Sequence, residues 1–528
     1  MTTSRTESAP VPDSSFDGGD LDCGNGLLLL IRKHIDPLDP GALLEILSSE
    51  SSVKEDLPAW CRLTGNELVQ VRFGEPRNAF LVSKGAFAGE REAEAIEAEA
   101  TAQPKMRTDG RRQAPMPQPA EEPFIPAELP APAPAPAMPP LAVAGVGSWP
   151  RPKWLLSALH EHLQGRISDE EFAATADDAV RLAVQAQERA GVDLVTDGEQ
   201  RRDNYSSFVG GLLQNCQLVP LTDLLPYVDD PEEFRREMDS LDVPAEQVRH
   251  PAVFGRLGRN QPIAAHELSF VREISEKPVK VALPGPYLLT RTMWMECISD
   301  RAYSSREELS VDVVRVMREE LAALLAGGAS LVQFDEPVLT EVAYGREDDG
   351  GGRSFMCGAL GDKLPVTEEL AFAESLITQV LEGFPAERLG LHVCRGNWTQ
   401  DEAAALTGDY APMLGLFSRV PVGTLVLELC TPRSGDAALL EAIPQDRRIG
   451  CGVVDQKSER IETAAEVIAR ADRVIEMFGA DRVLLNPDCG FATFADNPIS
   501  SAKVAEGKLQ AMAEASRELR HRHFGSST

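Results

Sequence analysis

From residue 141 to the end of the chain at 528, short apolar runs alternate with amphipathic stretches of helical period, and this alternation constrains the fold most strongly. Eight runs are strand candidates: 141–147, 192–196, 279–283, 330–334, 389–393, 424–429, 449–454 and 483–485. Two intervening helices open with capping boxes, at Ser168 and Ser305. The pattern predicts an α/β fold, a (β/α)8 TIM barrel with insertions, one of them at 217–275. A doubly wound sheet is the alternative, but no G-x-G-x-x-G follows a strand.

Polar side chains follow nearly every predicted strand. In a (β/α)8 barrel the catalytic groups lie at the C-terminal ends of the strands. The residues at these positions are Gly147-Ser148, Asp197-Gly-Glu199, Asp335-Glu336, His392-Val-Cys394, Glu428, Asp455-Gln-Lys457 and Cys489. A barrel with a purely structural role would not place charges there so regularly, so we expect an active site at this end.

Four of these residues have the side chains that bind zinc. His392 and Cys394 are two positions apart, so on a strand they share a face. Imidazole, thiolate and carboxylate are the usual zinc ligands, and Glu428 and Cys489 complete a set of four. The sequence therefore predicts a zinc (Zn2+) site.

Structural interpretations compete with these functional ones. Glu428 lies in an apolar run, where a salt bridge would also satisfy a buried carboxylate. Cys430 and Cys451 compete with Cys489 for the fourth ligand position. On a structural interpretation Asp335-Glu336 caps the next helix, 199–203 is a solvated loop, and Cys216, Cys297 and Cys357 only fill the core.

Residues 141–520 resemble the catalytic barrel of the cobalamin-independent methionine synthase family, in a shorter form without the N-terminal duplicate barrel. The matching motifs are Gly147-Ser-Trp-Pro, Asp197-Gly-Glu, Pro284-Gly-Pro-Tyr, Asp335-Glu-Pro, His392-Val-Cys, Glu428 and Asn486-Pro-Asp-Cys-Gly. The resemblance implies that His392, Cys394, Glu428 and Cys489 bind zinc. It also implies that Glu199 and Asp335 bind homocysteine as catalytic carboxylates, with the Gly147-Ser148 loop contacting the same amino acid.

The activity implied is zinc-dependent S-methyl transfer to a thiol, homocysteine or a similar one. Two thiolates and one carboxylate leave a zinc site with a net charge of about −1, which keeps a bound sulfur nucleophilic. Glu428, the hardest ligand of the set, is the one we expect a substrate sulfur to displace. The segment Asp455-Gln-Lys457 is a further catalytic candidate, although Lys457 stands where the full-length enzyme has His.

The methyl donor is open between methyl-tetrahydrofolate and a methylcorrinoid, the second with a corrinoid protein as partner. The alternative activity is thiol alkylation or a lyase reaction with another electrophile, of the epoxide and coenzyme M type. A small-molecule thiol and a methyl donor are the expected partners in the first case.

The first part of the chain is expected to form a separate small domain. Residues 1–19 are rich in Ser, Pro, Asp and Gly and are predicted to be disordered, and 20–87 predict a two-layer α+β sandwich of β-α-β-α-β-β type. This domain resembles the TusA-like sulfur carriers, which implies Cys23 as a carrier cysteine and a sulfur-relay partner, although both prolines of the family's Cys-Pro-x-Pro are absent. A degenerate recognition or packing module is the alternative. Residues 88–140, first rich in Glu and Ala and then in Pro and Ala, predict a long disordered linker.

Charge and cysteine usage exclude several classes of partner. The chain has 52 basic and 83 acidic residues, a net charge of −31, which repels nucleic acid and anionic membranes. Its nine cysteines are odd in number and include no C-x-x-C pair, which argues for reduced thiols. No signal peptide or membrane-length apolar run is visible. We therefore expect a cytoplasmic enzyme that binds neither nucleic acid nor membrane.

Overall fold

The structure, a computed structural model, divides into two compact units, residues 1–105 and 106–528. It describes residues 12–19, 27–35, 37–50, 53–64, 66–72, 77–85, 87, 113, 117–119, 122–163, 166–228, 230–239, 249–344, 364–397, 400, 405–435, 437–495 and 499–525. Cys23, the predicted carrier cysteine, lies outside these residues.

The first unit is a four-stranded sheet with two helices. Its elements are β1 (Ser14–Gly19), α1 (Leu28–Ile35), β2 (Leu43–Ser48), α2 (Val53–Leu63), β3 (Glu67–Arg72) and β4 (Asn78–Ser83), in the sheet order β1-β2-β4-β3. β1 pairs parallel to β2, and the other pairs are antiparallel. Apolar side chains of both layers, among them Ile31, Ile46, Leu57 and Phe80, form one core. The β-α-β-α-β-β order matches the sequence expectation.

β1 lies in the stretch 1–19 that the sequence predicts to be disordered, so that prediction is wrong for Ser14–Gly19. Despite its polar composition this segment forms a strand, because its backbone pairs with β2, with Ser14 opposite Leu44. Phe16 adds a side-chain contact, because its ring stacks on His34 of α1 at 4.6 Å. Backbone pairing and one aromatic contact thus order a segment of low hydrophobicity.

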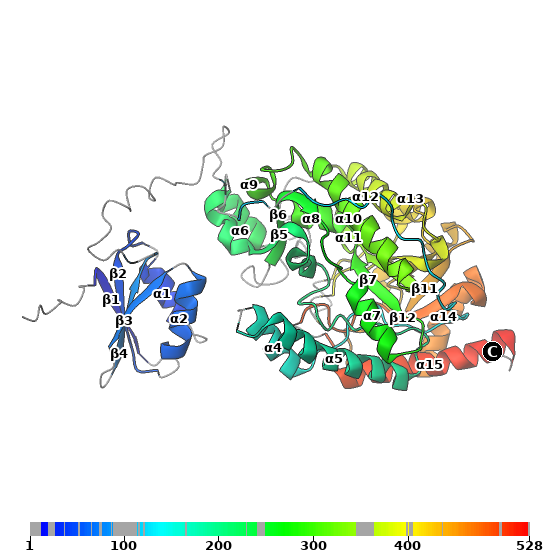
Figure 1. The fold of residues 1–528 in the computed structure, drawn as a ribbon. Coiled ribbons are helices and arrows are strands. Elements are labelled where there is room, and N and C mark those ends of the chain that lie inside the picture. The colour runs from blue at the N-terminus through cyan, green and yellow to red at the C-terminus, as the bar shows by residue number, and fades with distance from the viewer. Residues whose placement is uncertain are drawn as a thin grey trace, which may run out of the picture. The chain divides into compact units, whose positions relative to one another are not determined.

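The second unit is built on a parallel six-stranded sheet (Figure 1). Its strands are β7 (Lys280–Pro284), β8 (Leu331–Asp335), β9 (Leu389–Val393), β10 (Thr424–Leu427), β11 (Arg448–Val454) and β12 (Val483–Pro487). The first two predicted strands contribute only single bridges: Val143 pairs with Leu485, Ala144 with Leu194, and Val195 with Val279. These bridges connect β12 back to the start of β7, a circuit consistent with a TIM-like barrel.

Helices surround this sheet (Figure 1). They are α4 (Lys153–Leu163), α5 (Asp169–Ala190), α7 (Ala265–Ile274), α8 (Pro286–Met293), α9 (Glu296–Ser299), α10 (Arg306–Ala326), α11 (Val338–Tyr344), α12 (Val366–Leu381), α13 (Leu414–Arg419), α14 (Ala464–Phe478) and α15 (Ala502–Phe524). Ser168 and Glu171 form the complete capping box expected for α5. Ser305 caps α10, but the Glu308 carboxylate accepts from the Ser304 backbone instead, so only half of that box forms. Among the described residues, no helix is long and apolar enough to span a membrane.

The predicted insertion carries its own small core. Strands β5 (Gln214–Pro220) and β6 (Arg249–Gly258) pair antiparallel, and α6 (Pro231–Asp239) lies between them in the chain. A cluster of their apolar side chains, with Phe234 and Phe254 among them, also packs against Phe494. Phe494 follows β12, so the insertion supports a loop at the C-terminal end of the sheet.

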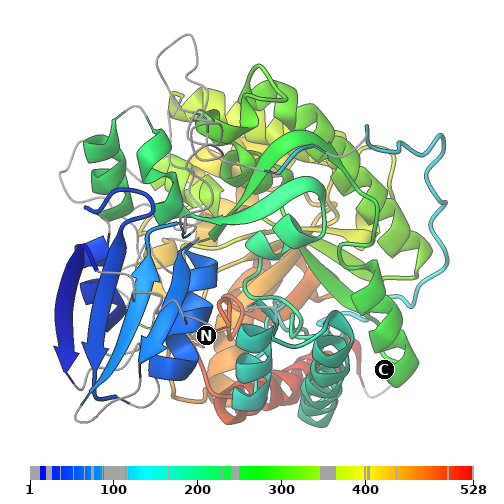
Figure 2. The same cartoon turned by 60° about the vertical axis from the view of Figure 1, so that its left-hand side comes forward.

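The Pro/Ala tract is not a free linker where the structure describes it, at 122–140, and the disorder prediction is wrong for this part. Ala133 donates to the Leu325 carbonyl at 3.1 Å, and its own carbonyl accepts from Arg388 at 2.7 Å. Met138 packs against the apolar cluster that includes Ala142 and Leu484. Figure 2 shows this stretch in cyan along the barrel unit. Proline restricts the chain to extended conformations in advance, so the entropy lost on docking is small.

Candidate metal centre and substrate pocket

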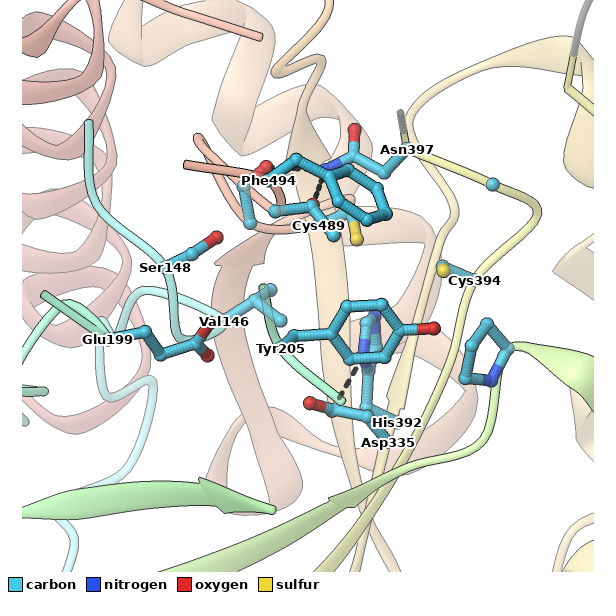
Figure 3. A pocket seen from close by; sticks show the side chains of 14 residues that line it. Val146, Ser148, Glu199, Tyr205, Asp335, His392, Cys394, Asn397, Cys489 and Phe494 are labelled. Carbon is cyan, nitrogen blue, oxygen red and sulfur yellow. Dashed lines mark hydrogen bonds and ion pairs between the residues drawn. The ribbon is translucent and has the colours of Figure 1, made fainter. Parts of the chain in front are cut away.

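Three of the predicted zinc ligands come together at the C-terminal end of the sheet. His392 lies in β9, Cys394 directly follows it, and Cys489 follows β12. One ligand atom from each lies within 4.8 Å of the other two, and all three residues are buried. Strand alternation explains the pairing, since His392 and Cys394 share a face, whereas Val393 between them belongs to the hydrophobic core. Figure 3 shows the side chains of His392, Cys394 and Cys489 at the pocket.

His392 is oriented by Asp335. Its Nδ1 lies 2.9 Å from Asp335 Oδ1, which also accepts from Gln333 at 2.7 Å. Burial disfavours the charged imidazolium, yet the hydrogen bond and negative charge of Asp335 outweigh it and raise the pKa of His392. The second ring nitrogen, Nε2, is buried without a hydrogen-bond partner among the described residues. A carboxylate behind one nitrogen and a bare second nitrogen is the usual arrangement of a metal-binding histidine.

A hydrogen bond between Cys394 and Cys489 gives the two thiols different pKa values. The hydrogen bond from Cys489 is the largest effect on Cys394, and with the nearby His392 it outweighs burial and lowers the Cys394 pKa to about 7. The same hydrogen bond, together with burial, raises the pKa of Cys489 well above its ordinary value. One thiolate is therefore present near neutral pH, and a cation would replace the proton held between the two sulfurs.

Glu428, the fourth predicted ligand, does not join this group. Its Oε1 accepts from Arg433 Nε at 3.0 Å and also from Arg433 Nη2, and its Oε2 accepts from the Arg395 backbone at 2.8 Å. The carboxylate is fully buried. The structure thus shows the salt bridge that is the structural interpretation of this residue. The rival ligands Cys430 and Cys451 are not in the group either, and burial raises the pKa of both thiols.

The three predicted ligands line a pocket together with three further predicted residues. The lining residues are Val146, Ser148, Glu199, Tyr205, Asp335, Pro337, His392, Cys394, Gly396, Asn397, Cys489, Gly490, Thr493 and Phe494 (Figure 3). Ser148, Glu199 and Asp335 are the predicted substrate-binding members. Gly147 lies directly behind, where a Cβ would overlap Glu199 Oε1.

Glu199 is held in a strained conformation. Its φ of 55° is in the left-handed region, which a non-glycine residue adopts at a cost. Arg151 fixes the backbone there by donating to the carbonyls of Glu199 at 2.8 Å, Arg202 at 2.7 Å and Ala492 at 3.0 Å. Burial, reinforced by Asp335 and opposed by Arg202, raises the Glu199 pKa to about 7. Its Oε2 has no hydrogen-bond partner among the described residues, so the pocket offers a carboxylate that a cationic group would stabilise.

The remaining catalytic candidates, Asp455 and Lys457, do not line the pocket. They follow β11, where Asp455 Oδ1 accepts from the Lys457 backbone at 2.9 Å in a turn. Gln456, between them, contacts the pocket wall, because it donates to Asn397 at 2.6 Å. Asp455 and Lys457 are therefore next to the pocket wall in the chain but do not form part of it.

Sequence reasoning missed several residues of the site. Tyr205 and Phe494 meet edge to face at 6.4 Å and form an aromatic wall of the pocket. Lys280 lies in β7, donates to the Gly145 carbonyl at 2.9 Å, and has a pKa lowered to about 8 by burial, which nearby Asp335 and Glu199 oppose. A lysine inside an apolar run was a visible signal. Glu336, by contrast, accepts from the backbone of Tyr287 and Leu288 at 2.8 and 2.9 Å and so caps α8, a helix that precedes it in the chain, and not the next helix as its structural interpretation had it.

Comparison with known proteins identifies the family. The model of the cobalamin-independent synthase catalytic domain matches residues 141–351 and 408–517. The chain belongs to this family. Within the matched ranges lie Glu199, Asp335 and Cys489, whereas His392 and Cys394 fall between them.

Relatives of this synthase family match over nearly their whole length. The methionine synthases of Saccharolobus solfataricus and Sulfurisphaera tokodaii are each 25% identical, over 387 and 396 residues, which cover 72% and 74% of this chain and 96% and 97% of theirs. A B12-independent methionine synthase from a Shewanella species, solved with selenomethionine, superposes with a TM-score of 0.54 at 22% identity, over 72% of this chain and 98% of that one. A putative enzyme of the same description from Listeria monocytogenes gives 0.50 at 17%, over 73% and 99%. The two structures support the fold, and the matched family model confirms the predicted family for the barrel unit.

Proposed function

We propose that this chain is a zinc-dependent S-methyltransferase of the methionine synthase type, which transfers a methyl group to the thiol of homocysteine. The observation that carries the proposal is that His392, Cys394 and Cys489 gather in the same pocket as Glu199 and Asp335. Relatives named methionine synthase, similar over nearly all of their length, support the reaction type.

The donor set fits zinc. One imidazole nitrogen without a partner among the described residues and two sulfurs that share a proton are soft and borderline ligands, which zinc favours over calcium or magnesium. When bound, zinc would lower the pKa of an incoming thiol and keep its sulfur nucleophilic at neutral pH. Asp335 holds the His392 ring in place for this.

The acidic side of the pocket fits the amino group of an amino acid. Asp335 is close enough to Glu199 for its charge to raise the Glu199 pKa, so an ammonium group placed between the two carboxylates would relieve their repulsion. Homocysteine carries an ammonium and a thiol on one short chain, which matches carboxylates and sulfur ligands lining one pocket. Ser148, whose Oγ accepts from the Ala492 backbone at 3.3 Å, holds the adjoining loop.

We propose methyl-tetrahydrofolate or a methylcorrinoid as the methyl donor. Thiol alkylation by an epoxide, with a thiol such as coenzyme M, would use the same metal ligands. An amino-acid thiol is favoured over coenzyme M because the carboxylates of the pocket would repel a sulfonate. Sulfur transfer through Cys23, and the TusA-like identity of the first unit, are proposals that the described residues do not address.

The test pairs metal analysis with a substrate screen. Purified protein should contain one zinc per chain, and homocysteine should be methylated in preference to cysteine or coenzyme M when methyl-tetrahydrofolate, methylcobalamin and an epoxide are offered in turn. Cys489→Ser should lose zinc and thiol methylation together, whereas Cys451→Ser, which changes a buried cysteine outside the ligand group, should keep both. A Cys489→Ser protein as active as the wild type would disprove the proposal.

A further inference from the structure

The feature that the proposed function leaves unexplained is the position of Glu428. Its side chain is only 1% exposed, and both of its carboxylate oxygens are already satisfied by Arg433 and by the Arg395 backbone. A buried carboxylate without a partner would be costly, so this ion pair is a complete alternative to metal binding.

The two groups that bind this carboxylate, the Arg433 guanidinium and the Arg395 backbone N–H, form its seat, and both are held by the surrounding structure. Arg433 lies in the short 3-10 helix Pro432–Ser434, five residues after Glu428, and presents two nitrogens to Oε1. The guanidinium of Arg395 donates to the Gly408 carbonyl at 2.9 Å and to the Tyr410 hydroxyl at 2.8 Å, which holds its backbone N–H in place, and its Nη1 also lies 3.8 Å from Glu428 Oε2. Tyr410 also accepts from the Glu428 backbone at 3.0 Å.

This seat is connected directly to the ligand group. Arg395 follows Cys394 in the chain, and its N–H points to Glu428 Oε2. On the other side, Asp488, which precedes Cys489, accepts from the backbone of Leu429, the residue after Glu428, at 3.0 Å. The carboxylate therefore sits beside the three ligands but is bound to arginine.

We propose that Arg433, with the Arg395 backbone, is a carboxylate seat that competes with the metal for Glu428 and so keeps one place beside the three ligands open for the substrate thiol. The inference rests on the proposed function. In it Arg433 is a positioning residue, because it acts on the site only through Glu428. A carboxylate that has two satisfactory partners can leave either one without becoming unpaired, so exchange is easy in both directions.

Binding measurements on Arg433→Met test the seat without relying on activity. Without the guanidinium, Glu428 loses its competing partner and binds the metal more firmly. We expect zinc to bind about tenfold or more tightly in competition with a chelator, the usual effect of one charge-assisted hydrogen bond. Homocysteine, measured by calorimetry on the zinc-loaded protein, should bind more weakly by a similar factor. Arg419→Met is the matched control, since Arg419 pairs with Glu374 through two nitrogens at 2.7 Å on the surface, and it should change neither constant.

A double variant separates the seat from general damage. In a Glu428→Gln background, Arg433→Met should have no effect on zinc or homocysteine binding, because the carboxylate it positions is gone. If Arg433→Met does not fold, Arg433→Lys, which keeps the charge but loses the two-nitrogen geometry, should show shifts of the same sign. Unchanged or weaker zinc binding in the folded Arg433 variants, or equal effects with and without Glu428, overturns the seat. Wild-type protein that binds no zinc would instead overturn the proposed function.

Discussion

Glu199→Gln should stabilise the protein at neutral pH, because the buried Glu199 carboxyl has a pKa of about 7 in the folded state against an ordinary value of 4.5. A pKa raised by folding contributes stability that is fully present below the unfolded pKa and is lost as the pH rises through the folded pKa. The difference between the two pKa values corresponds to a decrease of about 3 kcal/mol in the free energy of unfolding between about pH 4.5 and pH 7. Glutamine carries no charge at any pH, so the variant should not suffer this loss.

The assay is urea-induced unfolding of the metal-free protein at several pH values. Between about pH 4.5 and about pH 7, the free energy of unfolding of the wild type should fall by about 3 kcal/mol relative to that of Glu199→Gln, with no further change in the difference at higher pH. Glu267→Gln is a control of opposite sign, since the ion pair with Arg202 outweighs burial and lowers the pKa of Glu267, so that its stability is lost as the pH falls. Parallel pH profiles of the wild type and Glu199→Gln would refute the reasoning. The same variant should bind homocysteine more weakly, because one of the two carboxylates facing the ammonium is neutralised.

Two other substitutions test the geometry of the pocket. Asp335→Asn should weaken zinc binding about ten- to a hundredfold, the usual effect of losing the carboxylate behind a metal-binding histidine. The control is Asp312→Asn, which removes a carboxylate that accepts from Tyr303 outside the pocket and should leave zinc binding unchanged. Equal zinc affinities of the two variants, measured by chelator competition, would contradict the role of Asp335. Gly147→Ala should lower kcat/KM for homocysteine about a hundredfold by displacing Glu199. Gly145→Ala, where a Cβ meets open space, should leave kcat/KM nearly unchanged, and steady-state kinetics measure both variants.

Much of the barrel unit was predictable, because one physical rule links its sequence to its site. Parallel strands deliver their C-terminal ends to one edge of the sheet, so polar residues after separate apolar runs were expected to meet there. His392, Cys394, Cys489, Glu199 and Asp335 do line one pocket. The periodicity of a strand was enough to place His392 and Cys394 on the same face.

What the sequence could not settle depends on partners that are distant in the chain or on the backbone. Glu428 has two ways to satisfy a buried carboxylate, and only the three-dimensional placement of Arg433 and Arg395 decides between them. Asp455 and Lys457 follow a strand as the pocket residues do, but they lie in a turn and are not among the residues that line the pocket. β1 is held mainly by backbone hydrogen bonds, and the Pro/Ala tract by hydrogen bonds to its backbone, among them those from the Arg388 and Arg520 side chains; such contacts leave little trace in hydrophobic periodicity.

The most direct test of the zinc proposal is X-ray absorption at the zinc edge of the purified protein, which counts the atoms around the metal. The proposed function requires stoichiometric zinc with two sulfur neighbours and one imidazole nitrogen in the resting protein, and a third sulfur after homocysteine is added. Protein that binds no zinc, or zinc surrounded only by oxygen and nitrogen, would contradict it.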